Sequence, residues 1–405
     1  MLKIIDGGIC AAKGFRASGI HCGIRKNKTK YDLALICSDT PCSAAAVYTT
    51  NLVKGAPLVV TKKHLENGVA QAVIINSGNA NTCNANGVEV AETMCSFAAN
   101  GLGLSSDDVL VASTGVIGQP LPLEPIENGM PELLSKLSYE GSEDAATAIM
   151  TTDLTKKEVS VEFEIDGKIC HMGGIAKGSG MIHPNMATML VFITTDAAIS
   201  SEMLQKALSQ DVQKTFNMIS VDGDTSTNDN VIVMANGCAG NAVIENENEN
   251  FAIFMKALNT VTVALSRMIA SDGEGATKLL ECTVNGASTE EDAKIIAKSV
   301  ICSSLLKAAM FGADANWGRI LCAIGYSGAN VDVQKVSVSF VNAKGEVLVC
   351  ENGAGVDFSE EEAKEILLEK EIEIRIGLGD GDGKAVAWGC DLTYDYVKIN
   401  GDYRT

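Results

Sequence analysis

Short apolar runs rich in β-branched residues alternate along the chain with longer stretches of helical periodicity. Such runs predict strands, here at 33–36, 57–60, 72–75, 109–112, 159–163, 189–194, 231–234, 336–340, 371–376 and 385–388. Apolar residues at helical spacing predict helices at 88–99, 142–151, 202–216, 251–270 and 360–369. Ser288 and Glu291 match a capping box, which predicts a further helix running from there toward Phe311.

The order of these elements favours a mixed α/β (α+β) protein. Strict strand–helix alternation, which a doubly wound parallel sheet needs, is missing. Polar turns at 165–168 and 342–345 indicate hairpins between neighbouring strands. At 405 residues the chain is long for one domain, since about 150 residues per domain is usual, and two or three packed units are expected.

Composition narrows the range of functions. The net charge of −19 repels phosphate backbones, so a general nucleic-acid binder is not expected, and an acidic ligand would need a local cationic pocket.

The 13 cysteines form no Cys-x-x-Cys pair and the four histidines have no zinc-ligand spacing, so no metal site is expected. Scattered cysteines favour reduced thiols and a cytoplasmic location. No signal peptide and no run of roughly 18 apolar residues is found, so no membrane association is expected.

The centre of the chain carries a candidate nucleophile. A glycine-rich polar stretch, 177–183, leads into Pro184, and Thr188 then opens the apolar run 189–193. If the bond between Ala187 and Thr188 breaks, the threonine gains a free α-amine that can act as the base for its own hydroxyl. The pattern also fits an ordinary strand start, and composition alone leaves both interpretations open.

Other segments offer the groups that such a nucleophile needs. Thr114 and Gly115 follow a strand and can supply two donors to a developing oxyanion. Lys177 can hold a carboxylate, and Glu274, after the helix at 251–270, can hold an ammonium group. Each has a structural alternative: a common turn, a solvated lysine or a helix C-cap.

Three further polar segments allow more than one interpretation. The segments 76–81 and 220–229 are rich in short polar side chains and fit either structured turns or the wall of a site. The glycine-rich stretch 377–384 departs from the EF-hand pattern at its fifth and sixth positions, so a loop between two strands is expected there.

Taken together, these motifs resemble one family closely. The matching segments occur in order over essentially the whole chain, at 14–19, 76–81, 113–118, 150–153, 177–190, 223–229, 272–278, 314–319 and 396–405. With Ala-Thr-Met-Leu at 187–190 in the centre, the chain is similar to the ornithine acetyltransferases, also called glutamate N-acetyltransferases, of arginine biosynthesis.

The resemblance implies a self-cleaving enzyme. It implies a layered α-β-β-α scaffold with cleavage like that of N-terminal-nucleophile enzymes, and two associated parts, an α chain (1–187) and a β chain (188–405). Cleavage between Ala187 and Thr188 would make Thr188 the nucleophile. By the same resemblance, Thr114 and Gly115 form the oxyanion hole, and the residues that contact substrate, besides Thr188, are Thr152, Lys177, Glu274, Asn400 and Thr405.

The implied reaction moves the acetyl group of N2-acetylornithine to glutamate by a ping-pong mechanism, without a cofactor. Acetyl-CoA is a possible second acetyl donor, and an α2β2 assembly is the family's implication. Two alternatives remain at this point. One is a self-cleaving N-terminal-nucleophile aminopeptidase or amidase, which passes the acyl group to water. The other is a non-enzymatic α/β protein whose glycine loops hold a small anion.

Overall fold

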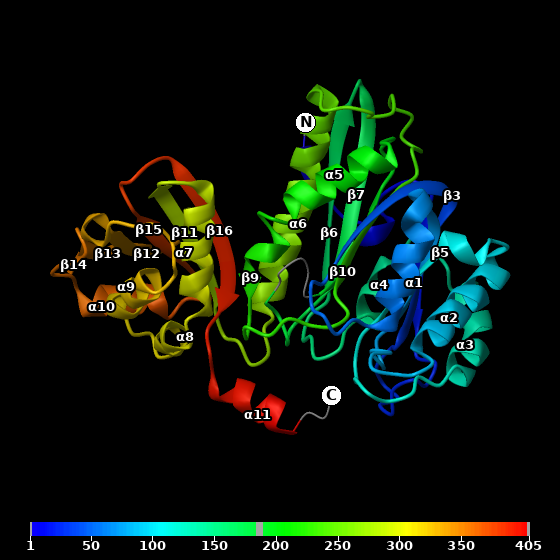
Figure 1. Ribbon diagram of the computed structural model, residues 1–405, viewed down its shortest axis with the longest axis horizontal. Helices are drawn as coiled ribbons and strands as arrows, with labels where there is room; N and C mark the ends of the chain where they lie inside the picture. The colour runs from blue at the N-terminus through cyan, green and yellow to red at the C-terminus, as the bar shows by residue number, and fades with distance from the viewer. Residues whose placement is uncertain (1, 184–188, 403–405) are drawn as a thin grey trace.

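The structure is a computed structural model that describes residues 2–183 and 189–402. Within these residues the chain forms two β-sheets, one of nine strands and one of seven, with helices packed on both (Figure 1). The mixed α+β class expected from the sequence is confirmed.

The larger sheet combines strands from both sides of the predicted cleavage site. Its order is β1-β6-β7-β8-β10-β3-β4-β5, with β2 also paired to β3. The strands are β1 (Leu2–Ile5), β2 (Phe15–Ile20), β3 (Leu33–Tyr48), β4 (Val69–Asn76), β5 (Val109–Ser113), β6 (Lys157–Ile165), β7 (Lys168–Lys177), β8 (Leu190–Thr195) and β10 (Asn230–Ala235). Strand β8 runs parallel to β10 and antiparallel to β7.

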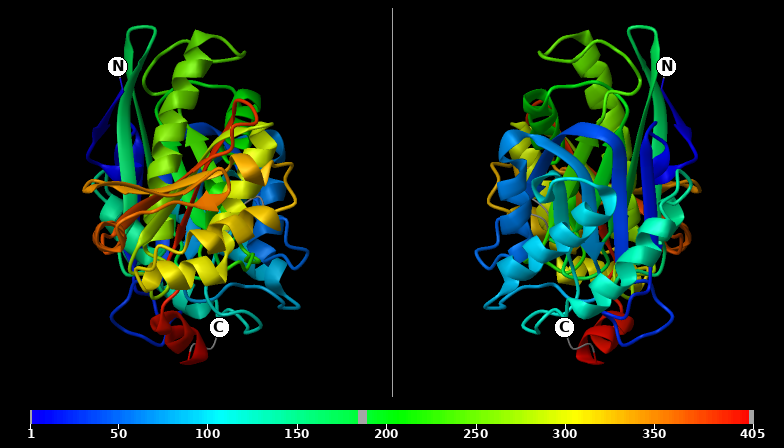
Figure 2. Two further views of the ribbon diagram at one scale, coloured as in Figure 1. Left: turned by 90° about the vertical axis from the view of Figure 1, so that its left-hand side faces the viewer. Right: turned by 90° about the vertical axis from the view of Figure 1, so that its right-hand side faces the viewer.

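Helices cover both faces of this sheet, because its strands alternate buried side chains between two faces. On β3, Leu33 and Leu35 pack into one apolar cluster with α1 (Ala56–His64), α2 (Gly87–Leu102) and α3 (Glu124–Ser135). The alternate residues Ala34 and Ile36 pack on the opposite face with α4 (Ser142–Ala148). Figure 2 shows α1 and α2, blue to cyan, on the side of the molecule away from the second sheet.

The second sheet is built from the C-terminal half. Its order is β14-β13-β12-β15-β11-β16-β9. The strands are β9 (Ile219–Ser220), β11 (Leu279–Ala287), β12 (Ser337–Asn342), β13 (Gly345–Glu351), β14 (Ala354–Gly355), β15 (Glu371–Gly377) and β16 (Gly383–Cys390). The remaining helices are α5 (Ser201–Asp211), α6 (Glu249–Ser271), α7 (Glu290–Cys302), α8 (Ser304–Phe311), α9 (Trp317–Gly325), α10 (Glu360–Leu367) and α11 (Tyr394–Asp402).

Helix α6 joins the two sheets. The Asn248 side chain caps its first turn, and its apolar stripe, including Phe254, Leu258 and Leu265, is fully buried. It packs on β6 and β7 of the first sheet and on β11 and β16 of the second. Among the described helices it is the one long and apolar enough to cross a membrane by length and composition alone. A helix buried in a protein core meets the same test, and the packing of α6 is that of a core helix.

Three sequence predictions about elements are wrong. Residues 57–60, predicted as a strand, lie in α1, where Pro57 occupies the first turn and Val60, Thr61 and His64 continue one buried face. The helix predicted from 202 to 216 ends at Asp211.

The third correction concerns the helix predicted toward Phe311. It begins with a Thr289 cap, in which the threonine side chain accepts from Asp292 N, instead of a Ser288 cap. It is also interrupted at Ser303, whose extended backbone ends α7 and whose hydroxyl caps α8. Both predicted hairpins are confirmed, and the segment 377–384 does join two strands, β15 and β16.

Candidate active site

One cavity of about 200 Å³ brings together residues that are far apart in the sequence. It lies where the ends of β5 and β7, the segments before β10 and after α6, and helix α11 meet. Of the sequence-predicted site residues, the cavity is lined by Thr114, Gly115, Thr152, Lys177, Glu274 and Asn400. Ala187, Thr188 and Thr405 lie outside the described residues.

Thr114 and Gly115 occupy a turn that a neighbouring asparagine shapes. Asn76 accepts the backbone N–H groups of Gly78 and Asn79 at 3.0 Å each, and its own carbonyl accepts Thr114 N at 2.9 Å. Gly115 has φ +122°, and a Cβ there would lie 2.8 Å from the carbonyl carbon of Gly78, so this position requires glycine. The Thr114 hydroxyl has no hydrogen-bond partner among the described residues, which leaves it able to donate to a ligand.

Lys177 is the last residue of β7 and lines the cavity with a side chain that is almost fully buried. No carboxylate oxygen of the described residues lies within ion-pair distance of its ammonium group. Its charge, with that of Lys157, lowers the pKa of Asp153, and it opposes the burial that raises the pKa of Asp229. A buried cation without a direct partner favours a ligand carboxylate in the cavity.

Glu274 and Asn400 also line the cavity and contact each other. Asn400 Nδ2, from α11, donates to Glu274 Oε2 at 2.8 Å, and Glu274 N donates to Ser179 O at 3.0 Å. A Cβ at Gly180 would lie only 2.3 Å from the Glu274 carboxyl carbon. The glycine-rich loop after Lys177 therefore has to be free of side chains here so that Glu274 can reach the cavity.

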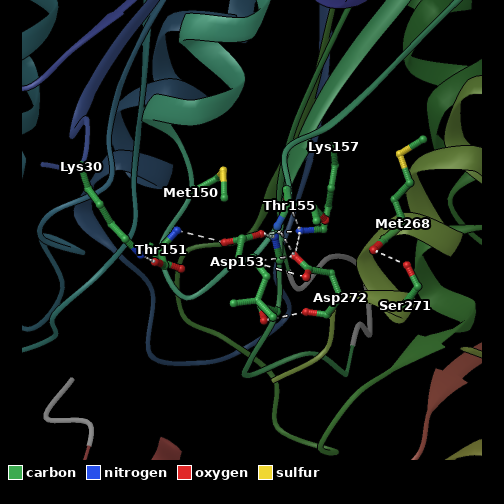
Figure 3. Close-up of polar contacts among 12 residues, drawn as sticks. Lys30, Met150, Thr151, Asp153, Thr155, Lys157, Met268, Ser271 and Asp272 are labelled. Atoms are coloured by element: carbon green, nitrogen blue, oxygen red, sulfur yellow. Dashed lines mark hydrogen bonds and ion pairs between the residues drawn. The ribbon is translucent and has the colours of Figure 1, made fainter. Parts of the chain in front are cut away.

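A buried ion network that the sequence did not indicate supports this arrangement. Lys157 Nζ bridges Asp153 at 2.7 Å and Asp272 at 2.6 Å, and the three side chains converge in Figure 3. Asp272 also accepts the N–H groups of Leu154 and Thr155. The network thereby ties the segment that carries Thr152 to the end of α6, directly before Glu274.

Asp153 extends the same network to the loop after β7. It accepts Thr151 N at 2.9 Å and Gly178 N at 2.7 Å. Burial alone would raise the pKa of Asp153, but the nearby charges of Lys157 and Lys177 outweigh it and lower the pKa to about 2. Asp153 is therefore ionised in the folded protein at any physiological pH.

The polar segment before β10 both forms structured contacts and lines the cavity, so both of its predicted interpretations apply. Asn228 Nδ2 donates to Ala80 O and Ser113 O, and Asn228 Oδ1 accepts the Thr82 hydroxyl at 2.5 Å. Asp229 follows on the cavity wall, and its Oδ2 is buried without a partner in the described part of the chain. Burial raises the pKa of Asp229 well above its usual value, against the opposing effects of a Ser226 hydrogen bond and of Lys177.

The segment that leads toward the predicted cleavage site is firmly anchored. The Asp222 carboxylate accepts Met181 N at 2.7 Å and Ile182 N at 2.9 Å. His183 Nδ1 lies 3.0 Å from Ser220 Oγ. Burial and the charge of Lys298 lower the pKa of His183 to about 4, so its ring is neutral at physiological pH.

The chain was compared with known proteins. The sequence model of the ArgJ family matches residues 16–405. The chain belongs to the ArgJ family. It is 54% identical over 405 residues, all of both chains, to the arginine biosynthesis bifunctional protein ArgJ of Caldanaerobacter subterraneus. It is 52% identical over 392 residues, 96% of both chains, to ArgJ 1 of Clostridium acetobutylicum.

Two solved structures also match parts of this chain. An ArgJ crystal structure from Bacillus halodurans is 46% identical with a TM-score of 0.50, covering 53% of this chain and 98% of that chain. Ornithine acetyltransferase of Mycobacterium tuberculosis, solved with ornithine, is 35% identical with a TM-score of 0.43, covering 46% of this chain and 100% of that chain. The resemblance drawn from the sequence motifs is thus confirmed: the chain is an ArgJ-family enzyme of arginine biosynthesis.

Proposed function

We propose that this enzyme transfers the acetyl group of N2-acetylornithine to glutamate through an acetyl ester on Thr188, after cleaving itself between Ala187 and Thr188. The observation that carries the proposal is the single cavity formed by Thr114, Gly115, Lys177 and Glu274, from both sides of that bond. Membership of the ArgJ family supports the same chemistry.

The strand register around the cavity supports the choice of nucleophile. Lys177, on the cavity wall, is paired with Leu190, the first residue of β8, and Thr188 precedes Leu190 by two residues. These observations support Thr188 as the residue that enters the site.

The proposed maturation is an N→O acyl shift. The Thr188 hydroxyl attacks the carbonyl carbon of Ala187, and the peptide C–N bond breaks to leave an ester and a free α-amine. Water then hydrolyses the ester, which releases the carboxylate of Ala187. An α-amine has a pKa of about 7.7–8.0, so part of it is neutral at physiological pH and can take the proton of its own hydroxyl during turnover.

Turnover then proceeds in two halves. Thr188 attacks the acetyl carbonyl of N2-acetylornithine, the Thr114 hydroxyl and the Gly115 N–H stabilise the tetrahedral oxyanion, and ornithine leaves. The α-amine of glutamate attacks the acetyl ester and regenerates Thr188. Lys177 holds a substrate carboxylate and Glu274 an ammonium group. Thr152, Asn400 and Thr405 complete the substrate contacts.

Several finer features belong to the same proposal. Acyl and proton transfer by these side chains needs no cofactor. Acetyl-CoA is a second acetyl donor, in keeping with the bifunctional names of the relatives. The 1–187 and 188–405 chains assemble as α2β2 in the cytoplasm.

A half-reaction assay tests the proposed transfer. Purified enzyme given N2-acetylornithine alone releases about one equivalent of ornithine and retains acetyl on the peptide that begins with Thr188. Glutamate then discharges it as N-acetylglutamate. Continuous release of acetate in the absence of glutamate would contradict the proposal and favour the aminopeptidase or amidase alternative. The relatives named ArgJ are 48–54% identical to this chain over nearly its whole length, and this similarity does not favour that alternative.

A further inference from the structure

The proposed mechanism needs a base that does not exist before cleavage. In turnover the α-amine of Thr188 accepts the proton of its own hydroxyl. In the uncleaved chain that nitrogen belongs to the Ala187–Thr188 peptide bond, and an amide nitrogen is not basic. Self-cleavage therefore needs a second proton acceptor at the same place, and the cavity wall is where it has to be found.

Asp229 lies next to the described end of the segment that carries Thr188. It directly precedes β10, whose first residue, Asn230, donates its N–H to Met189 O at 3.0 Å. Met189 is the residue after Thr188, so Asp229 lies where the chain carrying Thr188 enters the sheet. Asp229 also lines the cavity together with Thr114 and Gly115.

The Asp229 carboxyl also has an unused oxygen. Its Oδ2 is buried and has no hydrogen-bond partner in the described ranges, 2–183 and 189–402. A buried carboxyl oxygen left without a partner is costly, and such atoms are rare in folded proteins. Asp153 and Asp272, the other acids near this end of the cavity, are both bound to Lys157. Glu274 accepts Asn400 Nδ2 through one of its oxygens, and Asp229 is the acid among these with a fully buried carboxyl oxygen that has no partner in the described residues.

We infer that Asp229 is the general base of self-cleavage. Its Oδ2 takes the proton of the Thr188 hydroxyl while Oγ attacks the Ala187 carbonyl carbon. As the C–N bond breaks, Asp229 returns that proton to the departing nitrogen, which becomes the α-amine. Water hydrolyses the resulting ester, so the net change is the addition of one water across the peptide bond. In the mature enzyme the α-amine takes over the role of base.

The electrostatic surroundings suit this role. Burial raises the pKa of Asp229, which makes its ionised form a stronger base than an exposed aspartate. The charge of Lys177, from β7, acts in the opposite direction and favours the ionised form of Asp229. Glu274 is the other charged group on the cavity wall. The cleavage rate should therefore rise with pH until Asp229 is fully ionised and then level off.

The inference rests on the proposed function and is tested on the full-length precursor. Wild type, D229N, D229E and T188A are made by cell-free synthesis, and the conversion of precursor to two chains is followed over a range of pH. We expect D229N to cleave about 10²- to 10⁴-fold more slowly, the usual contribution of a general base, and D229E to recover part of the rate. D224N, an exposed aspartate of the same segment, is the matched control and should cleave like wild type.

A second variant separates a proton-accepting role from a structural one. Because Lys177 lowers the pKa of Asp229, K177M should move the midpoint of the rate–pH profile to higher pH. D229N that cleaves at the wild-type rate with the same pH profile would overturn the inference while leaving the nucleophile intact. Cleavage of T188A, or no cleavage of wild type between Ala187 and Thr188, would instead refute the proposed function.

Discussion

At the scale of single residues, neighbouring backbone contacts fix the turn after β5, which carries the two proposed oxyanion donors, the Thr114 hydroxyl and the Gly115 N–H. Asn76 holds the backbone on one side of the turn, and the close approach of Gly78 to Gly115 fixes the other. Donors that are already in place need no reorganisation when charge develops on a substrate oxygen. This is the basis for assigning the oxyanion role to Thr114 and Gly115.

Replacing Thr114 by alanine tests that assignment. Loss of one oxyanion donor should lower kcat about 10²- to 10³-fold with little change in KM, because the donor acts mainly on the transition state. T114S keeps the hydroxyl and should retain most of the activity. Steady-state kinetics with N2-acetylornithine and glutamate measure both constants. An equal loss of kcat in T114A and T114S would contradict a role of the Thr114 hydroxyl as an oxyanion donor.

The sequence motifs located Thr114, Lys177 and Glu274, because short segments with these residue types carried the family resemblance. They did not locate Lys157, and they included Asp229 only as a member of the polar segment 220–229. The importance of these two residues comes from burial and from contacts between distant segments, such as the bond from Lys157 to Asp272, 115 residues away. A local pattern of hydrophobic and polar residues does not encode such contacts.

At the scale of elements, the Lys157 network fixes two loops against each other. One is the segment with Thr151 and Thr152, and the other is the segment from Asp272 to Glu274. Removing one partner of a buried ion pair commonly costs about 3–5 kcal/mol, because the remaining charge is left without compensation. The geometry of the cavity therefore depends on this network.

Acid unfolding tests the contribution of Asp153. Its pKa, about 2, is below that of an unfolded aspartate, so its ionised form stabilises the folded state. This contribution, about 2 kcal/mol, is present above about pH 4 and is lost as the pH falls toward 2. Denaturant titrations at several pH values should show this loss in wild type and a smaller loss in D153N. Asp6 is exposed, so D6N should leave the pH dependence of the free energy of unfolding as it is in wild type.

Element prediction succeeded where one physical preference dominated. Long periodic stretches such as α6 and β-branched runs such as β8 and β10 occur close to where the sequence placed them. The run at 57–60 failed because Pro57 and two β-branched valines also fit the first turns of a helix whose buried face includes His64. The break at Ser303 could not be predicted, since a serine is compatible with both a helix interior and a cap.

At the scale of the whole molecule, the predicted cleavage point does not divide the larger sheet in space. Strands β8 and β10, from the C-terminal part, lie between β7 and β3, from the N-terminal part. Ladder hydrogen bonds and a continuous apolar core therefore cross from one predicted chain to the other. The ranges 1–187 and 188–405 remain a prediction about chains rather than about compact domains.

This arrangement predicts that the two chains stay together after cleavage. Separating them would expose the edges of four strands and much of the buried core, which is strongly unfavourable in water. Size-exclusion chromatography without denaturant should give one peak that contains both chains in equal amounts. Denaturant should separate them. Two peaks in native buffer would contradict the association.

The most direct test of the central claim is the intact mass of the freshly purified protein beside T188A. The proposal predicts two masses for wild type, corresponding to chains that end at Ala187 and begin at Thr188, and one full-length mass for T188A. A single full-length mass for active wild-type enzyme, or cleavage of T188A at the same bond, would contradict the assignment of Thr188 as the self-cleaving nucleophile.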